Sequence, residues 1–131
     1  MANKDEILKL LNDNLRSKDD IGLSHTITVL YLDGADSDFT HILLQLLECD
    51  WHILHEDIVD VLELIKDPIS VDKLYNLALN VPEDDECCSL GKKCIWALSA
   101  INTEDSRRKI KLLCNSQEPI IRETAILYFN E

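Results

Sequence analysis

The chain has 131 residues, the length of one domain, with 46% apolar and 29% charged residues. Aromatic residues make up only 5% and glycines number three, which argues against a β-sandwich or barrel and favours helices. The net charge of −12 at pH 7 disfavours nucleic acid and anionic membranes as partners and attracts basic proteins.

The apolar pattern predicts an all-α fold of about eight helices in four antiparallel pairs, forming a single domain over residues 1–131. The first three helices are expected at about residues 3–15, 20–32 and 39–47, and the turn before the third is rich in capping side chains. The fourth, at about residues 51–65, has the clearest helical period. Its apolar face holds Trp51, Leu54, Ile58, Val61, Leu62 and Ile65, and its opposite face holds His52, Glu56, Asp60 and Glu63.

Prolines mark two of the later helix starts. Asp67 ends the fourth helix and Pro68 begins the fifth, because proline suits a first helical turn and no interior position. Pro119 opens the eighth helix in the same way. The fifth helix is expected to end at about residue 79, and an acidic loop follows at 83–86. The sixth helix is expected at about 89–101. The seventh follows a cap at 102–105 and ends near residue 114.

Four apolar pairs line up when the predicted helices are compared. They are Val29 and Leu30, Val61 and Leu62, Ala97 and Leu98, and Ile126 and Leu127, with second residues spaced by 32, 36 and 29 positions. Twelve residues after the first three pairs lie Ile42, Leu74 and Ile110, and sixteen after them lie Leu46, Ala78 and Cys114. Such periodicity is typical of solenoids, which bind partners on extended surfaces and rarely bury a catalytic pocket.

Residues 118–122 (Glu-Pro-Ile-Ile-Arg), followed by Ala125, resemble the Asp-Pro-x-Val-Arg-x-x-Ala pattern that begins a HEAT repeat. Asp67 with Pro68 resembles the turn inside such a repeat. The stretches 51–58 and 92–98 are similar to small bacterial HEAT-repeat proteins. The resemblance covers about residues 20–130 and implies a HEAT-like α-solenoid.

The arginine of the HEAT pattern is matched only by Arg122. The equivalent positions of the other repeats hold His25, Asp57 and Lys93. The Asp–Arg ladder of long solenoids is therefore mostly missing, and we expect packing to set the register of the helices.

Cys49, His52 and His55 have the side chains of a zinc site. On a helix that begins near Trp51, however, the two imidazoles diverge, Cys49 precedes the first turn, and the sequence offers no evident fourth ligand. A metal site is the alternative to the interpretation that we favour, in which His55 packs beside the apolar stripe. We expect no metal and no cofactor.

The other reactive residue types also favour structural roles. Cys87 and Cys88 precede the sixth helix beside four acids, which raise a thiol pKa, so small packing residues are favoured over a redox pair. Ser24 and His25 are adjacent on a helix and point in different directions, and no nucleophile motif or glycine loop is present. We therefore expect no enzymatic activity. Five cysteines without regular spacing and no apolar leader or membrane-length run indicate a cytoplasmic protein.

Charge is unevenly distributed along the chain. Residues 1–88 hold 20 acids against 6 bases (−14), whereas residues 89–131 hold 5 against 7 (+2). The one basic run is Arg107, Arg108, Lys109 and Lys111, which is too small for nucleic acid against such a field. It pairs either with acids of a neighbouring helix or with the acidic rim of a partner.

The acidic turns are expected to line one side of the molecule and to bind a basic protein, with Trp96 as a partly exposed anchor. The alternatives are that the acids only maintain solubility and that Trp96 fills a seam between helices. The predicted partner-binding residues are Asp33, Asp36, Asp38, Glu56, Asp60, Glu63, Asp67, Glu83, Asp84, Asp85, Glu86 and Trp96. The favoured function is a non-enzymatic binding module, in its most concrete form an immunity protein that neutralises a basic antibacterial toxin such as a nuclease. The alternatives are a HEAT-repeat scaffold or chaperone-like lyase that holds a client or cofactor, and a HEAT-like nucleic-acid glycosylase.

Overall fold

The computed structural model describes residues 3–82, 84–85 and 87–130. This part of the chain contains eight α-helices, two short 3₁₀ turns and no strands, which confirms the all-α prediction. The helices are α1 (Lys4–Ser17), α2 (Asp20–Asp33), α3 (Thr40–Leu47), α4 (His55–Ile65), α5 (Val71–Leu79), α6 (Ser89–Ile101), α7 (Glu104–Leu113) and α8 (Pro119–Phe129). The 3₁₀ turns, η1 (Ser37–Phe39) and η2 (Pro68–Ser70), lead into α3 and α5.

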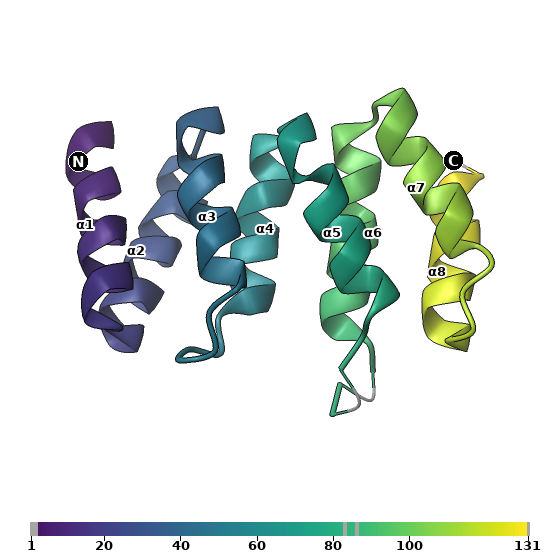
Figure 1. Cartoon of the computed structure of the whole chain (residues 1–131). Helices are drawn as coiled ribbons and strands as arrows, with labels where there is room; N and C mark the ends of the chain where they lie inside the picture. The colour runs from purple at the N-terminus through teal and green to yellow at the C-terminus, as the bar shows by residue number, and fades with distance from the viewer. Residues whose placement is uncertain (1–2, 83, 86, 131) are drawn as a thin grey trace.

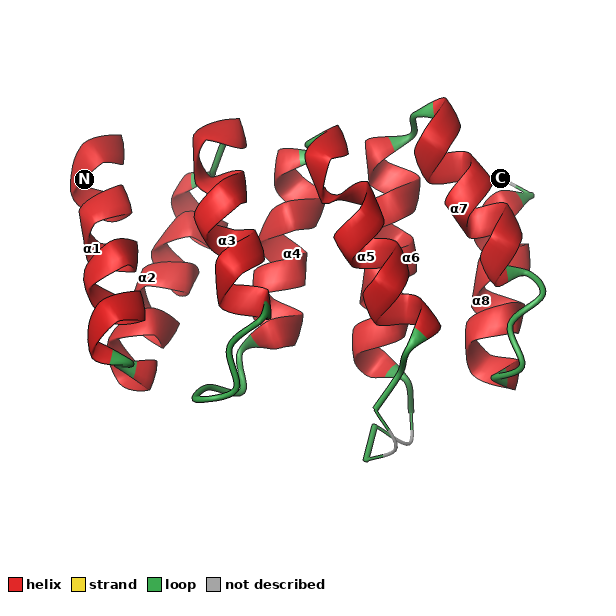
Figure 2. Cartoon of the chain, in the orientation of Figure 1, coloured by secondary structure: helices red, strands yellow, loops and turns green. Residues whose placement is uncertain are grey.

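The helices follow one another across the molecule in chain order and alternate in direction (Figure 1). The odd-numbered helices α1, α3, α5 and α7 form one layer, and the even-numbered helices α2, α4, α6 and α8 form the other, with contacts between successive helices of the even layer. Because direction alternates, the connections gather at two ends (Figure 2). The lower end, as drawn, carries the connections after odd helices, and the upper end carries the N-terminus of α1 and the connections after even helices.

The second residue of each of the first three aligned pairs lies in the core. Leu30, Leu62 and Leu98 are fully buried on α2, α4 and α6, and their partners twelve residues later are buried on α3, α5 and α7. Each such side chain contributes about 1.5–3 kcal/mol by leaving water. The two layers therefore hold together through one apolar stripe from each helix.

The fourth copy of the repeat differs from the other three in burial. Ile126 and Leu127 are 43% and 61% exposed, whereas Ile121 and Ala125 are the buried residues of α8. Alpha-helix α8 packs on α6 and α7, and among the described residues no later helix covers its outer side. The spacing of 29 therefore aligned the exposed face of α8 with the buried faces of the other helices.

The predicted start of the fourth helix is wrong. Helix α4 begins at His55, and residues 51–54 form an irregular loop in which Trp51 and Leu54 still pack against the core. The His52 side chain is the cause, because its Nδ1 accepts a hydrogen bond from the Leu54 N–H at 3.0 Å and so competes with helix formation. The other helices begin and end within a few residues of the predicted positions.

Caps fix several helix starts as the sequence predicted. Asp67 accepts a hydrogen bond from the Ile69 N–H at 3.0 Å and Pro68 fills the first position of η2. Thr103 and Ser106 form a reciprocal capping box at the start of α7. Each cap removes orphan backbone donors and stabilises its helix by about 0.5–2 kcal/mol.

Lysines, and not the expected arginine, link neighbouring helices of one layer. Lys93 on α6 lies 2.8 Å from Asp60 on α4, and Lys109 on α7 lies 3.7 Å from Asp72 on α5. Arg122 instead donates to the Ser116 carbonyl in its own connection. Exposed ion pairs are worth about 0–1 kcal/mol each, so packing carries most of the stability, in line with the prediction.

The register of α8 can be tested by a pair of truncations. We expect Ile121→Ala to lower the free energy of unfolding by about 2–5 kcal/mol, because it leaves a cavity at a fully buried position. Leu127→Ala should cost less than about 1 kcal/mol, because that side chain is 61% exposed. Urea denaturation followed by circular dichroism measures both, and equal costs would contradict the register described above.

Candidate protein-binding groove

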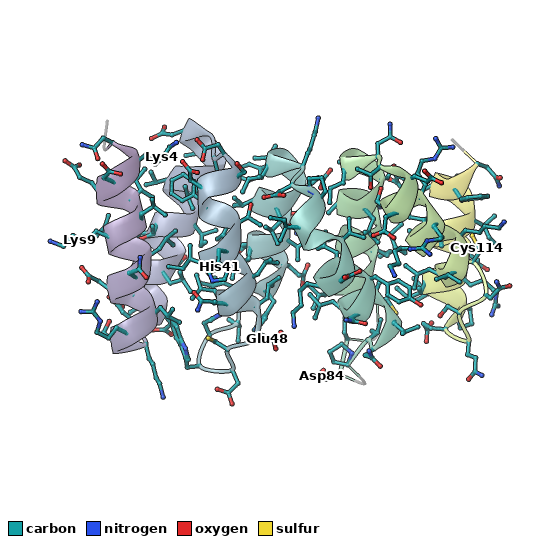
Figure 3. All side chains as sticks on the ribbon, turned by 45° about the horizontal axis from the view of Figure 1, so that its top comes forward. Lys4, Lys9, His41, Glu48, Asp84 and Cys114 are labelled. Carbon is teal, nitrogen blue, oxygen red and sulfur yellow. The ribbon has the colours of Figure 1, made fainter. Side chains whose placement is uncertain are left out.

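The predicted acidic turns do not share one side of the molecule. The turn with Asp33, Asp36 and Asp38 and the turn with Asp67 lie at the upper end, because both follow an even helix. Asp84 lies in the connection after α5 and therefore at the lower end (Figures 1 and 3). The expectation of a single acidic rim is thus wrong, and Glu83 and Glu86 lie outside the described residues.

Most carboxylates of the upper end already have structural partners. The Lys4 ammonium lies 2.7 Å from carboxylate oxygens of both Asp36 and Asp38. The hydrogen bond from Lys4 lowers the pKa of Asp36. The hydrogen bonds that Lys4 donates to Asp36 and Asp38 raise the pKa of Lys4. Asp67 is 8% exposed and caps η2. Of the predicted partner-binding acids at this end, Asp33, an exposed residue at the end of α2, has no such role in the described contacts.

The acidic stripe on α4 is partly neutralised. Lys93 reaches Asp60 at 2.8 Å and Glu56 at 3.7 Å. Although partial burial opposes it, the hydrogen bond to Asp60 raises the pKa of Lys93. Burial, assisted by Asp60, raises the pKa of Glu63. Trp96, three residues after Lys93 on α6, is half-buried, and its role as an anchor stays a prediction.

The lower end carries a groove of about 660 Å³ between two neighbouring loops, residues 48–54 after α3 and the described residues 80–82, 84–85 and 87–88 after α5. Both loops project below the helices in Figure 2. We call this hollow the lower-end groove. Its apolar lining is Leu47, Ile53, Leu77, Pro82 and Leu90.

Carboxylates rim the lower-end groove, namely Glu48, Asp50, Glu56, Asp84 and Asp85. Figure 3 shows Glu48 and Asp84 at the same lower edge of the molecule, each on its own loop. The described lining residues include no lysine or arginine. Three of the acids already have partners. Glu48 pairs with Lys73 and Glu56 pairs with Lys93. Asp85 accepts a hydrogen bond from the Ser89 N–H at 3.1 Å. The groove is therefore lined by both apolar side chains and carboxylates.

Ile53 stands out because it is 96% exposed. An isoleucine that stays in water forgoes about 1.5–3 kcal/mol of burial, so its position is not explained by folding stability. It follows the buried His52 and precedes Leu54, which packs on the core. The loop thus turns one apolar side chain outward while its neighbours point in.

Two histidines hold this loop in place. The His52 ring is 4% exposed, and its Nε2 lies 2.8 Å from the Leu46 carbonyl oxygen while its Nδ1 accepts from the Leu54 N–H. The proton must therefore sit on Nε2, which donates to Leu46. The His55 Nε2 lies 2.8 Å from the Cys49 carbonyl oxygen, and the two rings stack with centroids 4.5 Å apart. These bonds tie the end of α3 to the start of α4.

This geometry corrects one expectation about the histidines. His52 is buried, and not on the exposed face opposite the apolar stripe as its place in an assumed helix predicted. Both of its ring nitrogens are bonded to the backbone, which leaves neither free for a metal ion. The described residues contain no group of three or more potential metal ligands. The available sequence signal for this role was a histidine a few residues after the end of a helix, where its ring can bond both to the last carbonyls of that helix and to the N–H of the residue two positions later.

The cysteines of the described chain are free thiols. Burial, with Glu118 and Asp85 nearby, raises the pKa of Cys88, and burial raises the pKa of Cys94 to about 12. A raised pKa means fewer thiolates and less reactivity. These directions agree with the structural role that the sequence favoured for Cys88.

The basic run is already engaged within the protein. Lys109 pairs with Asp72 and lies over the Tyr75 ring, with Nζ 5.1 Å from the ring centroid. Arg108 pairs with Asp105 of its own helix. This outcome favours the alternative in which the run pairs with acids of the same molecule.

The fold and the groove together define an all-α protein of eight helices, in the described chain, with an apolar groove that is rimmed by carboxylates. Comparisons with protein-family models, with curated proteins and with solved structures found no match. None of the described helices combines the length and the apolar character that crossing a membrane requires.

The His52 hydrogen bonds predict a pH-dependent stability. Burial lowers the pKa of His52 in the folded state, so below about pH 6.5 the unfolded chain binds a proton that the folded chain does not. The contribution of neutral His52 to the free energy of unfolding is complete above that pH, and it is lost as the pH falls toward the pKa of His52 in the folded state. We expect urea midpoints to fall between pH 7 and pH 5.

Two variants isolate this effect. His52→Gln should lower the free energy of unfolding by about 1–3 kcal/mol at pH 7 and flatten the dependence between pH 7 and pH 5. His25→Gln, at an exposed position of α2, should leave that dependence unchanged. A wild-type slope that persists in His52→Gln would show that another group causes it.

Proposed function

We propose that the chain is a non-enzymatic protein-binding module, built as a HEAT-like α-solenoid, that binds a basic protein at the lower-end groove. The two layers of alternating helices and the three buried copies of the repeat support the solenoid assignment. The observation that carries the function is Ile53, 96% exposed on a loop that two histidines hold in place beside five rim carboxylates.

Charge and apolar contact have different tasks in this proposal. The net charge of −12 and the carboxylate rim accelerate encounter with a basic surface and orient it. Ile53 and the apolar lining then hold the partner, because a desolvated apolar centre inside a polar rim is the usual energetic core of an interface. Since the loop is already ordered, little conformational entropy is lost on binding.

The most concrete form of this proposal is an immunity protein that neutralises a basic antibacterial toxin. A nuclease toxin needs lysines and arginines to hold phosphates, and an acidic groove with an apolar centre covers such a surface. Asp50 and Asp84, the groove acids that have no partner among the described contacts, are available for this role, in contrast to the lysine-paired acids. The partner that we expect is a basic protein domain, with no nucleic acid and no cofactor in the complex.

The charge part of the proposal can be tested with two double variants of equal net charge. Groove variant Asp50→Asn and Asp84→Asn should slow association with a captured basic partner about tenfold at low salt, because local steering is lost. Control variant Asp5→Asn and Glu123→Gln, at exposed positions outside the groove, should change the rate much less. Affinity capture from the native host followed by stopped-flow binding provides the measurement. Capture of neutral or acidic partners alone, or equal effects of both variants, would contradict the proposal.

The apolar part is tested at Ile53. Ile53→Glu should weaken binding of the same partner about 30-fold or more, mainly through faster dissociation, as expected for a hot spot worth about 2 kcal/mol. The free energy of unfolding should change by less than about 0.5 kcal/mol, because the side chain is 96% exposed. The matched control is Ile69→Glu at the upper end, 73% exposed, which should leave binding unchanged. An equal loss in both variants would show that only total charge matters.

A further inference from the structure

Helix α2 is apolar on more than one side. Its inner face buries Leu23, Ile27 and Leu30, as the two-layer packing requires. Its outer face exposes Ile21 at 70%, Leu32 at 75% and Val29 at 37%. Single exposed apolar residues are ordinary, but several on one helix that carries apolar residues all round indicate a face that lacks its partner.

The exposed residues lie in one stripe along α2. Residues 21, 29 and 32 differ by eight and eleven positions, which places them on the same side of an α-helix. The stripe is about 16 Å long, or three helical turns. We call Ile21, Val29 and Leu32 the α2 stripe. It has the length and form of a surface that receives a short helix and not an extended chain.

A groove of about 220 Å³ runs beside the α2 stripe, between α2 and α4. Tyr31, which is 52% exposed, and Leu32 line one side of it. Asp57 and Asp60 of α4 line the other side. Asp60 is bonded to Lys93, whereas Asp57 is exposed and has no ion pair among the described residues. The apolar stripe is therefore flanked by one available carboxylate.

We propose that the α2 stripe and this groove form a second docking surface, which receives an amphipathic helix of about three turns with a lysine or arginine that reaches Asp57. The apolar side of that helix covers Ile21, Val29 and Leu32, and its basic side faces the wall formed by α4. This surface goes beyond the proposed function, because the α2–α4 groove and the lower-end groove have no lining residue in common.

Charge decides against a second copy of the chain as the occupant. Helix α2 contains no lysine or arginine, and its first and last residues are Asp20 and Asp33. A symmetric contact between two α2 stripes would bring carboxylates of two molecules, each with a net charge of −12, close together. A basic helix of another protein meets complementary charge at the same position.

The surface can be probed with a defined peptide. The probe is a helical peptide of about 12 leucines, lysines and alanines with its leucines on one face, and its control is a scrambled peptide of the same composition and charge. The peptide is titrated into ¹⁵N-labelled protein and followed by NMR at about 0.15 M salt, which screens contacts that depend on charge alone. We expect saturable changes in the amide chemical shifts of α2 and of residues 57–60, with at least about tenfold weaker binding of the scrambled peptide.

Variants assign the site. Leu32→Glu should weaken peptide binding at least about tenfold, and Asp57→Asn should reduce its salt dependence. Thermal denaturation should show that Leu32→Glu folds normally, because the side chain is 75% exposed. Ile53→Glu should leave peptide binding unchanged, so this inference and the proposed function can fail separately.

Four outcomes would overturn the inference. The first three are equal binding of the scrambled peptide, chemical-shift changes confined to the lower-end groove, and dimerisation of the free protein that Leu32→Glu abolishes. The fourth is binding of phosphatidylcholine vesicles that depends on Leu32, which would assign the α2 stripe to a membrane surface instead.

Discussion

The burial of one apolar stripe from every helix between two layers is the constraint on which the rest of this structure depends. Fully buried leucines of α2, α4 and α6 meet buried residues of α3, α5 and α7, and short connections make each helix run opposite to the one before it. Alternation then determines which loops become neighbours. The connections after α3 and α5 come together at the lower end for this reason, although about 30 residues separate them in the chain. The lower-end groove is therefore a consequence of the core, and needs no special backbone of its own beyond the histidine-held loop.

The same constraint explains what the sequence could and could not predict. Helix positions followed from apolar period, prolines and capping residues, which are local signals. The place of His52 was mispredicted because Trp51 and Leu54 happen to continue the period of α4, while the decisive hydrogen bond to Leu46 spans six residues and leaves no periodic trace. The alignment of Ile126 and Leu127 with three other apolar pairs gave no sign of their exposure, because an apolar pair looks the same whether or not another helix covers it. The exposure of Ile53 could not be predicted, because it depends on how the loop is held.

Acidic residues are equally visible in the sequence, yet their availability depends on lysines far away in the chain. Lys4 occupies Asp36 and Asp38, and Lys93 occupies Asp60 across 33 residues. These ion pairs are individually weak, but they cancel local charge and leave few open carboxylates at the upper end and along α4. Counting acids in the sequence therefore overestimated the number of unpaired carboxylates at the upper end and gave no reason to single out Asp50.

Once the paired acids are set aside, negative charge and exposed apolar area coincide at two places, the lower-end groove and the α2 stripe with Asp57. That coincidence matters because neither feature binds tightly alone. Carboxylates in water gain little from an ion pair, and an isolated apolar side chain gives too little contact to orient a partner. Next to each other, the apolar contact excludes water from the charges, and the charges restrict which apolar surface can dock. Under the two proposals, the lower-end groove and the α2 stripe would hold two basic partners at once, because they share no lining residue.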